Sequence, residues 1–251
     1  MTAPAVVNEL AKMRRLRVGP VVAAMVAGVV ALSCVELASP GFSGAMDDSA
    51  GLPWHRLLLG LGFAVPLVSP VLIAVLAGRQ VDLEHQGNGW LSSATAGLPA
   101  GRLCRAKLVA TGAVLVPATV TASALVVGAG VLAGITVDLP LGVWAAHTAS
   151  VVVVNLVLLA LHVLVAAVVE NQLVGTGIGV LGVFAAATAP AMPAWAAHLT
   201  PWGYYSLAAP VDHRDGELVA LAPSHGSVVA LGVAATVVFL LVSRRLDRRE
   251  V

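Results

Sequence analysis

The sequence predicts an all-α, polytopic membrane protein with six transmembrane helices in one domain spanning residues 1–251. Of the 251 residues, 59% are hydrophobic and only 11% are charged, whereas soluble domains carry about 45–50% apolar and about 25% charged residues. Six apolar segments approach the roughly 20 residues that a helix needs to cross a bilayer. This composition excludes a soluble globular protein and a disordered chain. It also excludes a nucleic-acid-binding protein, because the few charged residues cannot form an exposed basic face.

The six expected spans follow from the apolar segments. We expect them at residues 18–38, 57–78, 108–137, 142–169, 173–189 and 227–242. Prolines lie inside the second and third segments, and membrane helices tolerate them where neighbouring helices satisfy the freed backbone groups. Residues 177–182 match the GxGxxG dinucleotide-binding pattern, but no strand precedes them and no ribose-binding acid follows. We interpret Gly175, Gly179, Gly130 and Gly134 as positions of close helix packing.

The basic residues determine the predicted topology. Under the six-span plan, 12 of the 14 Lys and Arg residues fall on one side of the membrane, at 12–17, 79–107 and 244–249. Because cytoplasmic loops carry an excess of Lys and Arg, both termini are expected in the cytoplasm of a multi-pass plasma membrane protein. The excess of Arg over Lys, with abundant Ala, Gly and Val, suggests a high-GC bacterium.

Residues 1–17 have the pattern of an amphipathic helix. Apolar and polar side chains fall on different helical faces, with Val6, Leu10 and Met13 on one and Asn8, Lys12 and Arg15 on another. We expect an interfacial helix in the plane of the membrane, with its basic face towards lipid phosphates. The alternative is a frayed, merely positive leader.

The segment 79–107 is the one sizeable loop predicted in the cytoplasm. A turn signal at 87–89 precedes a short helix at 90–95, which Gly97 and Pro99 close. A second helical start at residue 101 leads into the third span. Trp90 either anchors the loop in the interface, where Trp is common, or presents a side chain to a cytoplasmic partner.

The segment 190–223 is the long external loop before the last span. Its aromatic residues, among them Trp202 and Tyr204, suit a membrane interface, and we expect a short re-entrant helical pair that closes a pathway from outside. His198 and His213 in this segment and His225 just after it do not have the spacing of a compact metal site. The sequence contains no recognisable Ser-His-Asp or Cys-His arrangement, so we predict neither catalytic nor metal-binding residues.

Three polar residues within the predicted spans are candidates for a substrate path. Asn155 and His162 are seven residues apart and share a helical face, and Glu36 lies near the external end of the first span. Polar groups in lipid are costly and often functional. One interpretation places Asn155 and His162 on a path through the membrane, at the interface with a second membrane chain. The other makes them interhelical hydrogen bonds, worth about 0.6 and at most 1–2 kcal/mol.

The cytoplasmic loop also carries a family resemblance. An acidic residue after the second span precedes a glycine turn, a tryptophan, a proline, an arginine and a lysine, which are here Glu84, Gly87 or Gly89, Trp90, Pro99, Arg102 and Lys107. This pattern resembles the permeases of ABC-2-type transporters, particularly those of lantibiotic immunity and antibiotic export. The six spans, the in-plane N-terminal helix and the external loop with residues 199–204 extend the resemblance over the whole chain.

The resemblance implies a division of labour between subunits. The 79–107 loop would form a coupling helix that docks on a cytoplasmic ATP-binding subunit, with Glu84, Trp90, Leu91 and Arg102 as coupling residues. The chain has no GxxxxGK[ST] phosphate loop, so ATP and magnesium would be bound by that partner and this chain would hold no cofactor. Two ATPases and a second permease, identical or related, would complete an exporter of amphipathic or hydrophobic compounds, such as a peptide antibiotic or drug.

Two alternatives to transport belong to other classes of function. A membrane sensor or assembly protein would bind a cytoplasmic partner through the 79–107 loop without transporting anything. An integral membrane enzyme acting on lipids would need acids, histidines or cysteines clustered near an interface, and the sequence shows no such cluster. The transporter is therefore the leading hypothesis and the sensor or assembly protein its alternative.

Overall fold

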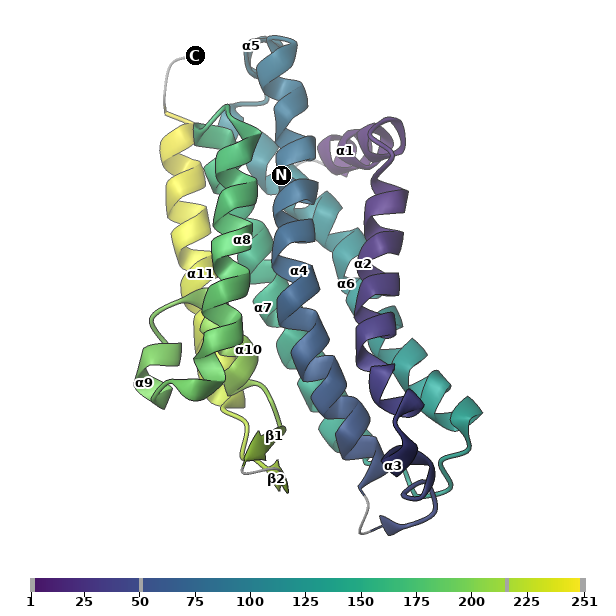
Figure 1. The fold of residues 1–251 in the computed structure, drawn as a ribbon. Coiled ribbons are helices and arrows are strands. Elements are labelled where there is room, and N and C mark those ends of the chain that lie inside the picture. Colours follow the sequence, from purple (N-terminus) through teal and green to yellow (C-terminus); the bar gives the residue numbers. More distant parts are fainter. Residues whose placement is uncertain (1–2, 50–51, 215–216, 249–251) are drawn as a thin grey trace.

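A bundle of long helices forms the body of the protein. The computed structural model describes residues 3–49, 52–214 and 217–248. The long helices run side by side (Figure 1), and they are α2 (Val18–Ser33), α4 (Pro53–Gln86), α6 (Ala100–Ala133), α7 (Leu141–Val168), α8 (Gln172–Thr188) and α11 (His225–Leu246). Among the described residues, five helices are long and apolar enough to cross a membrane, and α2 becomes a sixth when joined to the helix before it. The all-α polytopic membrane fold is confirmed.

The N-terminal helix α1 (Ala3–Arg15) lies across one end of this bundle (Figure 1). It is bent by 78° from α2, as expected of a helix that lies in the membrane plane while its neighbour crosses. Met13 and Val18 pack there against Leu76 of α4 and Ala110 of α6. The short helix α5 (Gly89–Thr95) lies at the same end of the bundle, and we call this end the α5 end.

The loop between the second and third spans is mostly helical. Helix α4 continues to Gln86 and α6 already begins at Ala100, so only short turns on either side of α5 remain of the loop expected at 79–107. Charged residues end the hydropathy signal near residues 78 and 108, but they do not end the helices. The short helix expected at 90–95 is present, and Gly97 follows it with a positive φ of 79°, which glycine adopts at little cost.

The opposite end of the bundle, called the hairpin end, holds the irregular elements. The first span ends at Ser33 and leads into short turns, and the segment before α11 contains short helices and a β-hairpin. These elements are η1 (Val35–Ala38), α3 (Pro40–Ser43), η3 (Ala189–Ala191), α9 (Ala194–Ala197), η4 (Pro201–Gly203), α10 (Tyr204–Leu207), β1 (Val211–Arg214) and β2 (Glu217–Ala220). The strands pair antiparallel, which the expected helical pair did not anticipate.

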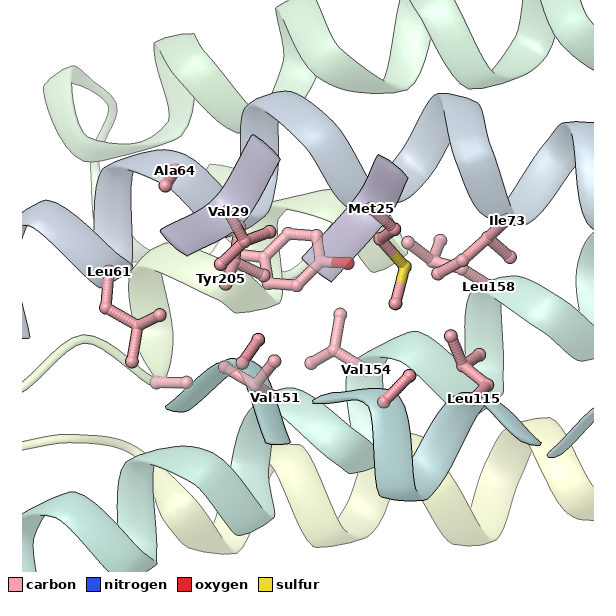
Figure 2. Close-up of a cluster of buried hydrophobic side chains, with 14 of the residues drawn as sticks. Met25, Val29, Leu61, Ala64, Ile73, Leu115, Val151, Val154, Leu158 and Tyr205 are labelled. Atoms are coloured by element: carbon pink, nitrogen blue, oxygen red, sulfur yellow. The ribbon is translucent and has the colours of Figure 1, made fainter. Parts of the chain in front are cut away.

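Helix α4 is central to the packing, since it contacts α2, α6, α7 and α8. Figure 2 shows side chains from several helices meeting in the buried core, among them Met25, Leu115 and Leu158. Gly130 and Gly179 allow close approach as predicted, because a Cβ would lie 2.6 Å from Trp54 at the first and 2.9 Å from Ala74 at the second. The other two glycines do not pack in this way. Gly134 ends α6 in the left-handed conformation, and a Cβ at Gly175 would meet only open space.

Candidate functional site

Four charged side chains join three helices at the α5 end. They form what we call the ionic cluster, which consists of Glu9 and Lys12 of α1, Glu84 of α4 and Lys107 of α6. The Lys107 Nζ donates to Glu9 Oε2 at 2.7 Å, to Glu84 Oε1 at 2.8 Å and to the Gln80 carbonyl at 2.7 Å. An ammonium has three N–H donors, so every donor of Lys107 is used.

The ionic cluster is buried but electrically balanced. The side chains of Glu9 and Lys107 are 0% exposed, and that of Glu84 is 4% exposed. Burial alone lowers the pKa of Lys12, but its hydrogen bonds to Glu84 and Glu9 outweigh this effect and raise the pKa above its usual 10.5. Lys12 is therefore protonated at neutral pH. Two cations then face two anions, which is the condition under which buried charges are tolerated.

This geometry corrects one expectation from the sequence. Lys12 was expected to face lipid phosphates, but its Nζ lies 2.7 Å from both Glu9 and Glu84. Glu84, expected among the coupling residues, has its carboxylate in the ionic cluster, where it binds Lys12 of α1 and Lys107 of α6. Gly89 lies against the same residue, because a Cβ there would collide with the Glu84 carboxylate. The start of α5 and the ionic cluster are thus packed together.

Trp90 connects α5 to two membrane helices through a residue that the sequence did not single out. Its Nε1 donates to His85 Nδ1 at 3.4 Å, and the two rings meet edge to face with centroids 5.6 Å apart. The His85 Nε2 donates in turn to the Ala166 carbonyl of α7 at 2.8 Å. A neutral imidazole with its proton on Nε2 satisfies both bonds. Trp90 is half-buried, whereas Leu91 beside it is 50% exposed and is the apolar side chain that α5 presents outward.

Arg102 lies at a second junction, between the start of α6 and the end of α11. Its backbone N–H donates to Asp247 Oδ1 at 2.9 Å, while its side chain is exposed. Asp247 also accepts from Arg105 Nη2 at 2.8 Å, and Arg105 Nη1 donates to Ser243 Oγ at 2.8 Å. A Cβ at Gly101 would collide with the Ser243 carbonyl. Asp247 therefore satisfies an otherwise free N–H at the α6 N-terminus and holds α11 against it.

The three candidate path residues lie apart. Asn155 is 1% exposed and bonds across helices, donating to Thr119 Oγ1 at 3.0 Å and accepting from the Tyr205 hydroxyl at 2.5 Å. His162 is also 1% exposed, and neither ring nitrogen has a hydrogen-bond partner among the described residues. Glu36 lies in η1 at the hairpin end and accepts from Ser39. Asn155 thus has the interhelical role that the sequence left open as the alternative.

A cavity of about 420 Å³ opens at the hairpin end. Apolar side chains of α4 and α8 line it on one side, including Phe63, which is 62% exposed. Asp212 and Arg214 of β1 add polar groups to its lining. The cavity therefore combines an apolar wall with one acid and one base. Within the part of the chain that the structure describes, no group of three His, Cys, Asp or Glu residues is placed to hold a metal.

The helix bundle, with one helix lying across its end and a short helix bonded to its spans, defines a polytopic, helical integral membrane protein. A family model described as ABC-2 family transporter protein matches residues 5–186, well over half of the chain. The chain belongs to this family and is the membrane component of an ABC transporter, a transport subunit rather than a catalytic one. The match covers the ionic cluster and α5 but does not distinguish the lantibiotic-immunity type. A search of curated proteins found no match.

Proposed function

We propose that the chain is the permease subunit of an ATP-binding-cassette exporter, with ATP hydrolysed on a separate cytoplasmic subunit. The observation that carries this proposal is the attachment of α5. The helix is short, it lies at the end with most of the basic residues, and Trp90 and His85 bind it to α4 and α7. A helix held in this way transmits a movement of a bound partner directly to two membrane helices.

In this mechanism, the coupling residues have different tasks. Leu91 is exposed and contacts the ATP-binding subunit, and the exposed Arg102 side chain adds a positive charge nearby. Trp90 and His85 pass the movement of α5 to α4 and α7. Glu84 acts one step further inside, because the ionic cluster ties α4 to α1 and α6. Four helices then move with α5 when the partner moves.

The complete transporter contains two ATP-binding subunits, which bind ATP and magnesium, and a second permease that is identical or related. It lies in the plasma membrane, with the α5 end and both termini in the cytoplasm, in keeping with the basic residues at that end. The cavity at the hairpin end then faces outward. Its apolar wall with Asp212 and Arg214 suits an amphipathic or hydrophobic compound, such as a peptide antibiotic or drug, whose export confers resistance.

The test is purification of the chain from its native membrane, with mass spectrometry of the proteins that accompany it. We expect a stoichiometric ATP-binding protein with the wild type, and its loss in Leu91→Asp. Leu199→Asp is the matched control, because Leu199 is a 72% exposed leucine in the segment between α9 and η4. Retention of the ATPase by Leu91→Asp would refute docking through α5. Purification with a protein that binds no nucleotide would favour the sensor or assembly alternative instead.

A further inference from the structure

A second, larger hollow lies between α6, α7 and α11, and neither the coupling mechanism nor the cavity at the hairpin end uses it. This groove has a volume of about 840 Å³ and an almost entirely apolar lining. It is hollow because small residues from all three helices meet there, among them Gly112, Ala113, Ala160, Gly232 and Ala235. The volume falls within the range of about 300–1,000 Å³ that is usual for small-molecule sites.

The groove has a strongly basic end. Arg105 lines it at the α5 end, and Arg244 follows Leu240 of the lining by one helical turn, hence on the same face of α11. The side chains of Arg102, Arg245 and Arg248 are exposed at the same two helix ends. Asp247 is already paired with Arg105. The rim therefore carries an excess of positive charge directly beside an apolar hollow.

We propose that this groove binds one acidic phospholipid, with an acyl chain in the hollow and the headgroup phosphate on the arginines. The chemistry matches at both ends. Arg binds phosphate through parallel N–H donors, and basic clusters next to a membrane helix attract anionic lipids. The bound lipid spans α6 and α11 beside the Arg105–Asp247 pair and adds to their contact. The proposal needs only the membrane location of the chain and does not rest on transport.

A second protein chain fits the groove less well. Two copies that met symmetrically through this face would bring their Arg244 side chains together, and like charges repel. The arginines also lie at the headgroup end of the groove rather than along it, as a lipid requires. A single amphiphile with one anionic end is therefore the occupant that the charge distribution selects.

The experiment is native mass spectrometry of the purified chain after exchange into mixed phosphatidylglycerol and phosphatidylcholine with the same acyl chains. We expect the wild type to retain phosphatidylglycerol several-fold over phosphatidylcholine. Arg244→Gln should reduce this preference several-fold, and its control is Arg14→Gln, an exposed arginine of α1. Ala113→Phe fills the groove and should reduce retention of both lipids, whereas Ala234→Phe places the same ring on an exposed α11 position outside the lining.

Each result decides the proposal. Equal retention of both lipids by the wild type would overturn it in favour of ordinary annular lipid. So would an equal loss of the preference for phosphatidylglycerol in Arg244→Gln and Arg14→Gln. Crosslinking between two copies of the Ala113→Cys variant through that thiol would overturn it in favour of a protein contact. Thermal unfolding is measured for every variant. If Ala113→Phe unfolds early, the surface pair of arginine variants still decides between a specific and a general lipid contact.

Discussion

The ammonium of Lys107 lies 2.8 Å from the carboxylate of Glu84, and neither side chain is more than 4% exposed. The two residues are 23 positions apart and belong to different spans. Glu9 and Lys12 complete the charge balance from α1. The pair therefore fixes where the N-terminal helix rests on the bundle, directly next to the helix that we assign to the ATPase contact.

Removal of one charge from this pair should lower the stability of the protein far more than removal of both. Lys107→Met leaves the buried Glu9 and Glu84 with a single counter-ion, the half-buried Lys12, and an unpaired buried charge costs about 3–5 kcal/mol. We expect a large fall in thermal stability in detergent for Lys107→Met. The double variant Lys107→Met/Glu84→Met should recover much of it. Additive losses in the double variant would show that the two residues do not interact.

Gly89 should be intolerant of even one methyl group. In Gly89→Ala the Cβ collides with the Glu84 carboxylate, and overpacking typically costs about 1–3 kcal/mol. Gly87→Ala is the control, because its Cβ would meet its nearest neighbour, the Leu83 carbonyl, at an ordinary 3.6 Å. Thermal unfolding of both variants measures the difference. Equal stability of the two would mean that α5 does not pack on Glu84 as described.

Trp90 should affect coupling more than stability. Trp90→Phe keeps an aromatic ring but removes the N–H donor to His85, a net loss of about 0.5–1.5 kcal/mol. Trp90→Ala removes both contacts. We expect transport per ATP hydrolysed, measured in proteoliposomes with the partner ATPase, to fall modestly in Trp90→Phe and several-fold in Trp90→Ala. Trp195→Ala changes a 69% exposed tryptophan of α9 and should leave the ratio unchanged. An unchanged ratio in Trp90→Ala would remove Trp90 from the coupling route.

Local patterns in the sequence predicted the spans and α5 correctly. Hydropathy identifies a membrane helix without knowledge of its neighbours, and the glycines at 87 and 89 with Pro99 mark the limits of α5. Helix ends were predicted less well, because α4 and α6 continue beyond the apolar residues into the ionic cluster. The β-hairpin was missed because its strands contain few strand formers, with Val211 in β1 and Val219 in β2. The Asp-Gly pair at 215–216 of the sequence was the one local hairpin signal.

The ionic cluster and the Asp247 junction were not predictable in the same way. Lys107 meets Glu9 across 98 positions of sequence, and Arg105 meets Asp247 across 142. Each of these residues lies just outside an apolar run, where a charged side chain is normally solvated. Partners so far apart in the sequence leave no periodic pattern from which their contact could be predicted. The family resemblance pointed to Glu84, but its inward orientation follows only from the packing of α1 across the bundle.

The hydrogen bond between Tyr205 and Asn155 offers a test of the two interpretations of Asn155. Figure 2 shows the Tyr205 ring among core side chains, so loss of its hydroxyl in Tyr205→Phe leaves the side-chain Oδ1 of Asn155 without this donor in the core. Such bonds within membrane proteins contribute about 0.6 kcal/mol and at most 1–2. We expect a measurable fall in unfolding temperature for Tyr205→Phe and for Asn155→Leu, and a smaller one for Tyr204→Phe in the same short helix. Unchanged stability of Asn155→Leu with altered substrate export would instead restore Asn155 to the translocation path.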